Sequence, residues 1–312
     1  MVTGLIQDKS YLEHDTGDHP ETPARLEAIR LRLDGNGMSA EAASAAPRPA
    51  SADELGAVHD AEFIEHVRKV CRGGMPVLDS MDTAVCPVSY DVALLAAGAG
   101  LVAADRIAAG EWSSAFCAVR PPGHHAEHAE AMGFCLFNNV AVLARYFQRR
   151  HAIGRILILD WDIHHGNGTQ HVFEEDPSVF YISLHQWPFY PGTGAAWDRG
   201  RGAGEGLTLN VPMPGGTTDQ SYLRAFDQQV VPAIDAFRPE VILISAGFDA
   251  HKDDPLGGFR LTEESFIEMT RTVIDLARRH AGGRIVSLLE GGYNLDALAR
   301  CVEGHLGALI EA

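Results

Sequence analysis

The sequence lacks several features that would place it in common classes of protein. None of its five cysteines forms a CxxC pair; they are Cys71, Cys86, Cys117, Cys135 and Cys301. An odd, scattered set of thiols argues against a disulfide framework and against a cysteine zinc site, and it favours a reducing, cytoplasmic location. We find no basic start followed by a hydrophobic core and cleavage site, so we expect no secretion signal. The apolar stretches fall short of the roughly 20 residues that a membrane span needs.

Positive charge is also scarce. The chain has 25 Lys and Arg residues against 42 Asp and Glu residues, which gives a formal net charge of −17. This balance disfavours nucleic acids and anionic membrane surfaces as partners. It would attract a cationic substrate such as a lysine-rich tail or a polyamine, although acidic surfaces also serve solubility.

No linker divides the 312 residues, and no internal repeat of fixed period is present. The segment MSAEAASAAPRPA, residues 38–50, is rich in alanine, serine and proline, and we interpret it as a surface connection after the first helix. We therefore expect a single domain over residues 1–312.

Short apolar runs alternate with helical patterns along the chain. The runs are residues 115–119, 156–160, 180–184, 241–245 and 285–289, and the helical patterns cover 24–33, 60–71, 88–109, 136–150, 219–237, 262–280 and 295–310. Such runs are typical of buried parallel strands in a three-layer α/β/α fold. Polar or aromatic side chains follow each run. Parallel sheets bind ligands at the carboxyl ends of their strands, so we expect these side chains to lie together at one edge of the sheet and to form the functional site.

The run at 156–160 continues as ILILDWDIHH, with Asp160, Asp162 and His164 at every second position. In an extended chain these side chains project to one side. Aspartate and histidine together suit a divalent cation such as zinc, and carboxylates buried this densely would repel one another without a cation or protons. The alternative is a polar strand end with capping aspartates.

Asp249 follows the run at 241–245 and completes a set of three candidate ligands with Asp162 and His164. Three ligands leave zinc an open position for water, as a catalytic site requires. Two carboxylates also neutralise the charge of the ion and make it a weaker Lewis acid, so we expect a further hydrogen-bond donor that helps to polarise the substrate. Tyr293, which follows two flexible glycines, could supply a hydroxyl donor. The alternative interpretation is that Tyr293 is a structural tyrosine in the core whose hydroxyl is already hydrogen-bonded.

His124 and His125 follow the stiff segment RPPG. A lone histidine is usually structural or solvated. A pair in a rigid loop, at the edge that carries a metal site, is better explained as a base and its partner. Asp160 could orient one of the imidazoles by accepting its second N–H.

Four ordered motifs resemble the histone deacetylase family, specifically its class II members and the bacterial histone deacetylase-like amidohydrolases. They are RPPGHHAEHAEAMGFCLFNNVAVLARY, ILILDWDIHHGNGTQHVFEEDPSVFYISLHQWPFYPGTG, SAGFDAHKDDPLGG and LLEGGYN. The segment HDTGDHPETPARL looks like the family's first loop and helix. The resemblance implies an arginase-like fold with a central eight-stranded, mostly parallel sheet, and a single deacetylase catalytic domain over residues 1–312.

The resemblance also implies individual roles. Zinc, with iron(II) as the alternative, would bind Asp162, His164 and Asp249. His125 would be the general base and acid, with Asn167 as its partner where class I members have an aspartate. His124, hydrogen-bonded to Asp160, would stabilise transition-state charge together with Tyr293. A potassium ion would be held by Asp160, Asp162, His164, Ser183 and Leu184.

The family's acyl-lysine tunnel maps onto aromatic residues of this chain. Phe134 would line it together with Tyr190, which follows Phe189 and stands where phenylalanine is usual. The Gly133 carbonyl would accept the substrate amide N–H, and Asp82 or Thr83 would touch the substrate at the rim. Leu256 stands at the position where family members that prefer acetylpolyamines can carry a glutamate. Its uncharged side chain would not attract a cationic substrate.

We therefore expect a zinc-dependent deacetylase that acts on an acetylated lysine peptide or a small acylated amine. Three alternatives stay open: an acetylpolyamine amidohydrolase, a binuclear arginase-like ureohydrolase and a non-catalytic acyl-lysine-binding protein. A ureohydrolase needs additional aspartate and histidine ligands for a second metal ion. The run at 156–160 supplies only Asp160 beyond the three ligands already named. The sequence does not indicate an oligomeric state.

Overall fold

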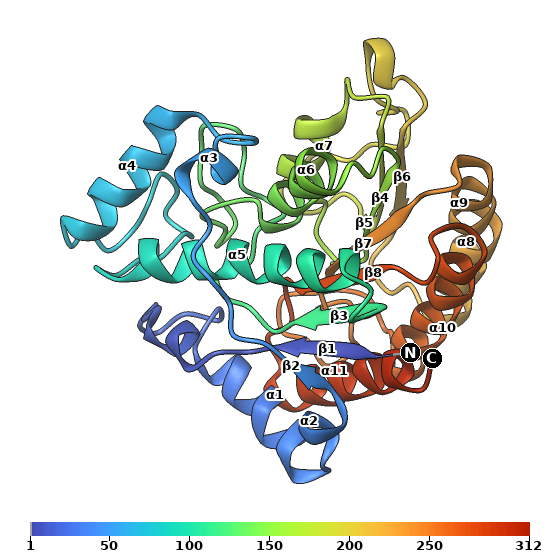
Figure 1. The fold of residues 1–312 in the computed structure, drawn as a ribbon, viewed down its shortest axis with the longest axis horizontal. Coiled ribbons are helices and arrows are strands. Elements are labelled where there is room, and N and C mark those ends of the chain that lie inside the picture. The colour runs from blue at the N-terminus through green and yellow to red at the C-terminus, as the bar shows by residue number, and fades with distance from the viewer. Residues whose placement is uncertain (1) are drawn as a thin grey trace.

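The computed structural model describes residues 2–312, which fold into a three-layer α/β/α arrangement around a parallel sheet (Figure 1). The sheet in these residues has eight strands in the order β2-β1-β3-β8-β7-β4-β5-β6, and every neighbouring pair is parallel. The strands are β1 (Thr3–Ile6), β2 (Ala43–Ser44), β3 (Ser114–Cys117), β4 (Ile156–Asp160), β5 (Val179–Gln186), β6 (Thr208–Met213), β7 (Val241–Ala246) and β8 (Ile285–Leu289). The predicted fold class is confirmed.

Helices cover both faces of the sheet. In Figure 1, α5 and α6 lie on one face, and α1, α10 and α11 pack together on the other. The longer α-helices are α1 (Ala24–Gly35), α4 (Ala61–Arg72), α5 (Ser89–Ala108), α6 (Asn139–His151), α10 (Glu263–His280) and α11 (Leu295–Ile310). The shorter segments are η1 (Lys9–Glu13), α2 (Met38–Glu41), α3 (Ala52–Leu55), α7 (Asn167–Phe173), η2 (Gly202–Gly204), α8 (Asp219–Ala225), η3 (Phe226–Val230) and α9 (Val231–Phe237). Among residues 2–312, no helix is both long and apolar enough to cross a membrane.

The five predicted runs form five adjacent strands, β3, β8, β7, β4 and β5, at the centre of the sheet. Every residue of β3, β4, β7 and β8 is buried, because helices cover both faces of these strands. Their carboxyl ends therefore meet at one edge, as the sequence predicts.

Three strands escaped prediction because they carry weak signals. β1 is a four-residue strand that contains a glycine, and β2 has only two residues at one edge of the sheet. β6 forms the other edge and includes Pro212, which cannot donate to a neighbouring strand and is tolerated at an edge. The segment 38–50, interpreted above as a surface connection, in fact contains α2 and β2.

The helix predicted at 219–237 is not uniform. It is a run of α8, the π-helical segment η3 and α9, with Pro232 at the start of α9. Proline has no N–H to donate to the preceding turn, and a π-helical segment accommodates the missing bond.

Candidate metal and catalytic site

Within residues 2–312, one group of side chains is arranged so that it could hold a metal ion. One ligand atom from each of Asp162, His164 and Asp249 lies within 4.8 Å of the others. His164 Nδ1 is 3.0 Å from Asp162 Oδ1 and 3.2 Å from Asp249 Oδ2. Asp162 and His164 follow β4 and Asp249 follows β7, the neighbouring strand, so the topology brings the three together.

The aspartates gather through a bend and not through the extended alternation that the sequence suggested. β4 ends at Asp160, where the chain leaves the sheet. The N–H of Asp162 donates to Asp160 Oδ1 over 3.2 Å, and the N–H of His164 donates to Asp162 Oδ1 over 2.9 Å. The N–H of Ile163 donates to Asp249 Oδ1 over 2.9 Å. These backbone donors hold the carboxylates in place without using every oxygen.

One carboxylate oxygen of this group is left free for a ligand. Asp249 Oδ2 is buried; His164 Nδ1, at 3.2 Å, is not aligned to donate to it, and no other residue in 2–312 donates a hydrogen bond to it. Burial and, to a lesser degree, the nearby Asp162 carboxylate together raise the pKa of Asp249 to about 7. Two buried carboxylates at this distance need a cation or a proton between them, and the donor set suits a divalent metal ion.

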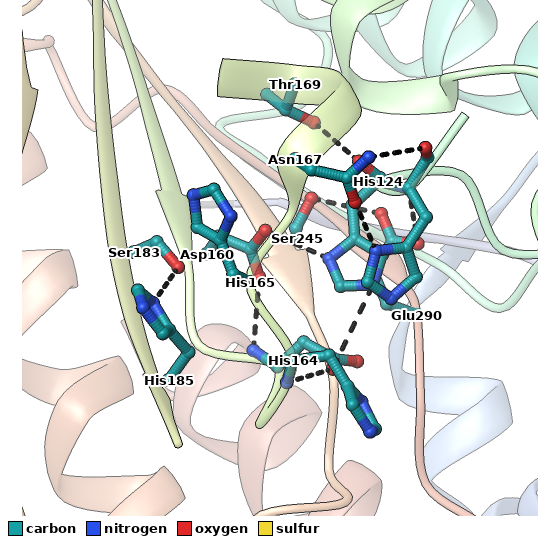
Figure 2. A network of polar contacts seen from close by, with 12 residues as sticks. His124, Asp160, His164, His165, Asn167, Thr169, Ser183, His185, Ser245 and Glu290 are labelled. Atoms are coloured by element: carbon teal, nitrogen blue, oxygen red, sulfur yellow. Dashed lines mark hydrogen bonds and ion pairs between the residues drawn. The ribbon is translucent and has the colours of Figure 1, made fainter. Parts of the chain in front are cut away.

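His124 lies beside this group on the segment that follows β3. Its Nδ1 donates to Asp160 Oδ2 over 3.0 Å (Figure 2), and the Tyr181 hydroxyl donates to the same oxygen over 3.1 Å. Burial lowers the pKa of His124, but the carboxylates of Asp160 and Asp162 outweigh burial and raise the pKa to about 10. His124 is therefore a cation at neutral pH in this arrangement.

His125 has the opposite electrostatics. Burial, together with the charges of His124 and His164, holds its pKa well below the usual value, so His125 is neutral at pH 7. Its Nδ1 lies 2.8 Å from Asn167 Oδ1, and its ring centroid is 4.0 Å from that of His124. The two imidazoles thus lie side by side, one charged and one neutral.

A pocket of about 250 Å³ reaches His125 and His164. Its lining contains Asp82, His125, Gly133, Phe134, His164, Phe189, Tyr190, Leu256 and Tyr293. Of the residues predicted to contact the substrate, only Thr83, the alternative to Asp82, is outside this lining. The Phe189 ring stacks on His164 with centroids 5.3 Å apart, and Tyr190 meets His125 edge-on at 5.2 Å. The walls are mainly aromatic and apolar.

The turn at Gly133 and Phe134 forms one wall of this pocket. Both residues have positive φ, 56° and 70°, which glycine adopts without strain but which costs energy for Phe134. Strained residues of this kind cluster at functional sites. A Cβ at Gly133 would lie 2.3 Å from the His125 ring, so only glycine fits there. The Thr83 hydroxyl accepts the N–H of Phe134 over 3.3 Å, which links the rim segment to the turn.

Tyr293 closes the pocket from the loop after β8. Its N–H donates to Asp254 Oδ2 over 2.6 Å, and the Arg25 guanidinium lies 4.9 Å from the ring centroid. Burial raises the pKa of Tyr293 well above its usual value, so the hydroxyl keeps its proton and can donate it in a hydrogen bond.

The predicted potassium residues lie where β4 ends, beside the middle of β5. Asp160 is paired with Ser183 across the two strands, and Leu184 follows in β5. The Ser183 hydroxyl lies 2.9 Å from His185 Nδ1, as Figure 2 shows.

Sequence reasoning missed Glu290, which is fully buried behind the histidines. Its Oε2 accepts the N–H groups of Gly123 and His124 over 2.6 and 3.2 Å, and its Oε1 accepts the Ser245 hydroxyl over 3.0 Å (Figure 2). Burial raises the pKa of Glu290 to about 7. A signal was available, because a glutamate that directly continues a buried strand is rarely without a partner.

Comparisons with known proteins agree with this geometry. Residues 19–309 match the model of the histone deacetylase domain. The chain is 42% identical to the histone deacetylase-like amidohydrolase of Pseudomonas aeruginosa over 94% of this chain and 76% of that protein. It is 39% identical to histone deacetylase 14, chloroplastic, of Arabidopsis thaliana over 96% of this chain and 74% of that protein. The crystal structure of the HDA15 HD domain superposes with a TM-score of 0.94 at 39% identity, covering 99% of this chain and 88% of that chain.

Proposed function

Because the chain belongs to the histone deacetylase family, we propose that it is a zinc-dependent deacetylase, with one catalytic domain over residues 1–312. It would hydrolyse the acetyl amide of acetyl-lysine, or of a similar acylated amine, to acetate and a free amine. The observation that carries this proposal is the buried Asp249 oxygen that accepts no hydrogen bond. It belongs to a three-ligand group whose His164 lines the same pocket as His125 and Tyr293.

Asp162, His164 and Asp249 would hold the metal ion. One imidazole and two carboxylates suit zinc, with iron(II) as the alternative ion. When bound, the ion would polarise the amide carbonyl and lower the pKa of a water molecule. We also assign a potassium ion to Asp160, Asp162, His164, Ser183 and Leu184, where it would offset the charge of the buried carboxylates.

The protein's own residues would move the protons and stabilise charge. His125, neutral at pH 7, would accept a proton from the attacking water at Nε2 and return it to the leaving amine. His124, a cation paired with Asp160, would stabilise negative charge that develops nearby. The Tyr293 hydroxyl would donate a hydrogen bond to the carbonyl oxygen as it becomes an oxyanion.

The pocket supports an acyl-lysine stem as the group that enters it. Phe134, Phe189 and Tyr190 offer apolar faces to a methylene chain, and the Gly133 carbonyl would accept the amide N–H. Asp82 and Leu256 stand at the rim, where the rest of the substrate would lie.

The other interpretations have less support. A binuclear ureohydrolase needs a second set of ligands, whereas Asp160 is already held by His124 and Tyr181. A non-catalytic reader would not need His125, Tyr293 and the three candidate ligands together. Cytoplasmic location stays a prediction, because two plant relatives are named as chloroplastic.

The proposal is tested by incubating the zinc-loaded protein with an acetyl-lysine peptide and measuring acetate release, with arginine as the alternative substrate. We expect acetate release that His125→Ala abolishes, and no urea from arginine. Urea production with two bound manganese ions, or binding of the peptide without turnover, would overturn it.

A further inference from the structure

A chain of hydrogen bonds leads from His125 towards solvent through residues that the proposed reaction leaves unassigned. His125 Nδ1 lies 2.8 Å from Asn167 Oδ1, and Asn167 Nδ2 donates to Glu127 Oε1. The two Glu127 oxygens lie 2.9 and 3.0 Å from His171 Nδ1. The path begins at the buried imidazole of His125 and ends at His171, whose side chain is 43% exposed.

Two acceptors determine which way the Asn167 amide faces: the carboxylate of Glu127 and the main-chain carbonyl of His125, to which Asn167 Nδ2 donates over 3.3 Å. The ionised carboxylate is the stronger of the two. An amide can present either its oxygen or its nitrogen to a neighbour, whereas an ionised carboxylate only accepts hydrogen bonds. Glu127 therefore takes the NH₂ side of Asn167. The carbonyl oxygen of the amide is left facing His125.

This orientation in turn selects one tautomer of His125. A carbonyl oxygen can only accept, so His125 must carry its hydrogen on Nδ1. Nε2 then keeps its lone pair, which is the form that a general base needs. We propose that Glu127 is a positioning residue that sets the tautomer of His125 by fixing the Asn167 amide. The proposal rests on the role of His125 as the base in the proposed function.

The surroundings hold Glu127 firmly in this role. Asn167 and His171 are four residues apart on α7, so the helix presents both to the same carboxylate. The hydrogen bond to Glu127 raises the pKa of His171 and favours its protonated, donating form. The Glu127 carbonyl lies 2.9 Å from His59 Nδ1, which ties the backbone down as well. The Glu127 side chain is only 21% exposed.

The first experiment replaces Glu127 by glutamine, which is equal in size but both donates and accepts. The Asn167 amide then loses its charged acceptor and keeps only the weaker hydrogen bond to the His125 carbonyl, so its orientation is less strongly fixed. We expect kcat for an acetyl-lysine peptide to fall by roughly 10- to 100-fold, as for other partners that orient a functional histidine, with KM nearly unchanged. Glu130→Gln is the matched control, because Glu130 is an exposed glutamate of the same loop. It should retain the wild-type kcat.

The second experiment exchanges the amide and the carboxylate. In the double variant Glu127→Gln with Asn167→Asp, the introduced carboxylate again offers only acceptors to His125, and the introduced amide donates to it. We expect kcat of the double variant to be at least roughly tenfold higher than kcat of Glu127→Gln. Asn167→Asp alone places two carboxylates against each other and should stay impaired.

The third measurement needs no enzymatic activity. Nitrogen-15 chemical shifts of the zinc-loaded protein, assigned with His125→Ala, report which nitrogen of His125 carries the hydrogen. We expect the Nδ1–H tautomer in the wild type and in the double variant, and a substantial Nε2–H population in Glu127→Gln. An unchanged tautomer in Glu127→Gln, or a double variant no more active than Glu127→Gln, overturns the proposal. A wild-type protein without deacetylase activity would instead overturn the proposed function, and the tautomer would still decide the role of Glu127.

Discussion

The backbone of Gly291 lies directly against the carboxylate of Asp162, to which its N–H donates over 2.8 Å. A Cβ at position 291 would lie 2.1 Å from Asp249 Oδ2 and 2.6 Å from Asp162 Oδ2. The candidate metal site thus depends on a residue that has no side chain.

Gly291→Ala should therefore disrupt metal binding while every ligand is kept. The added methyl group would displace both carboxylates, and we expect bound zinc and kcat/KM to fall at least roughly 100-fold, since metal sites tolerate small errors poorly. Gly35→Ala is the control, because a Cβ there meets no atom within 4 Å. Stoichiometric zinc in Gly291→Ala, measured by metal analysis after dialysis, would contradict the assigned site.

Tyr293→Phe should separate chemistry from folding. The ring keeps its packing against Arg25 and Phe134, so metal content and melting temperature should not change. Losing the hydroxyl should lower kcat by roughly 10²- to 10³-fold, the usual cost of one oxyanion donor. Tyr146→Phe, which removes a hydroxyl bonded to Asp105 on the surface, should have the wild-type rate. A wild-type rate in Tyr293→Phe would make this tyrosine structural.

Glu21 should make stability depend on acid pH. Burial alone would raise its pKa, but Arg120 and Arg25 outweigh burial and lower the pKa to about 2. A carboxyl whose pKa is lowered by folding stabilises the protein above its ordinary pKa of 4.5 and loses this contribution as the pH falls towards 2.

Glu21→Gln should accordingly lower the free energy of unfolding at pH 7 by about 3 kcal/mol, because it leaves buried arginines uncompensated. The gap between wild type and variant should narrow by about 1 kcal/mol between pH 5 and pH 3.5. His14 Nε2 lies 3.6 Å from Glu21 Oε2 and its pKa depends on the Glu21 charge, so both proteins are compared in a His14→Gln background, which removes this second titration. Urea unfolding at several pH values measures the gap, and a gap that stays constant would refute this account.

Leu256 should bias the enzyme away from acetylpolyamines. It lines the pocket, where it offers no charge to a second ammonium group. We expect kcat/KM to be higher for acetyl-lysine peptides than for N-acetylputrescine or N-acetylspermidine. Leu256→Glu should shift this ratio towards the polyamines, and the uncharged Leu256→Gln should not. A tenfold preference of the wild type for an acetylpolyamine would show that the prediction is wrong.

The sequence predicts the centre of this molecule better than its edges. The five central strands are continuous apolar runs, such as ILILD in β4, because helices cover both of their faces. β2 and β6 are edge strands, where a short or proline-containing segment suffices, so their sequences carry little pattern. The pattern of apolar and polar residues therefore locates the central strands and their carboxyl ends, but it does not identify the edge strands.

The candidate site shows the same division. Asp162, His164 and Asp249 follow predicted strands, so topology alone brings them together. Glu290 accepts the N–H of His124, and Glu127 accepts a hydrogen bond from Asn167, the partner of His125; in both bonds the two residues are over 30 positions apart in the sequence. No local pattern specifies such pairs, and only the folded chain shows them.

The most direct test of the account removes and restores the metal while activity and bound metal are measured in the same samples. Acetate release from an acetyl-lysine peptide should vanish on chelation and return in proportion to bound zinc, saturating at one equivalent. Asp249→Asn, equal in size but without the charge of the free oxygen, should neither bind zinc stoichiometrically nor release acetate. Full turnover by the chelated, metal-free protein would contradict the account.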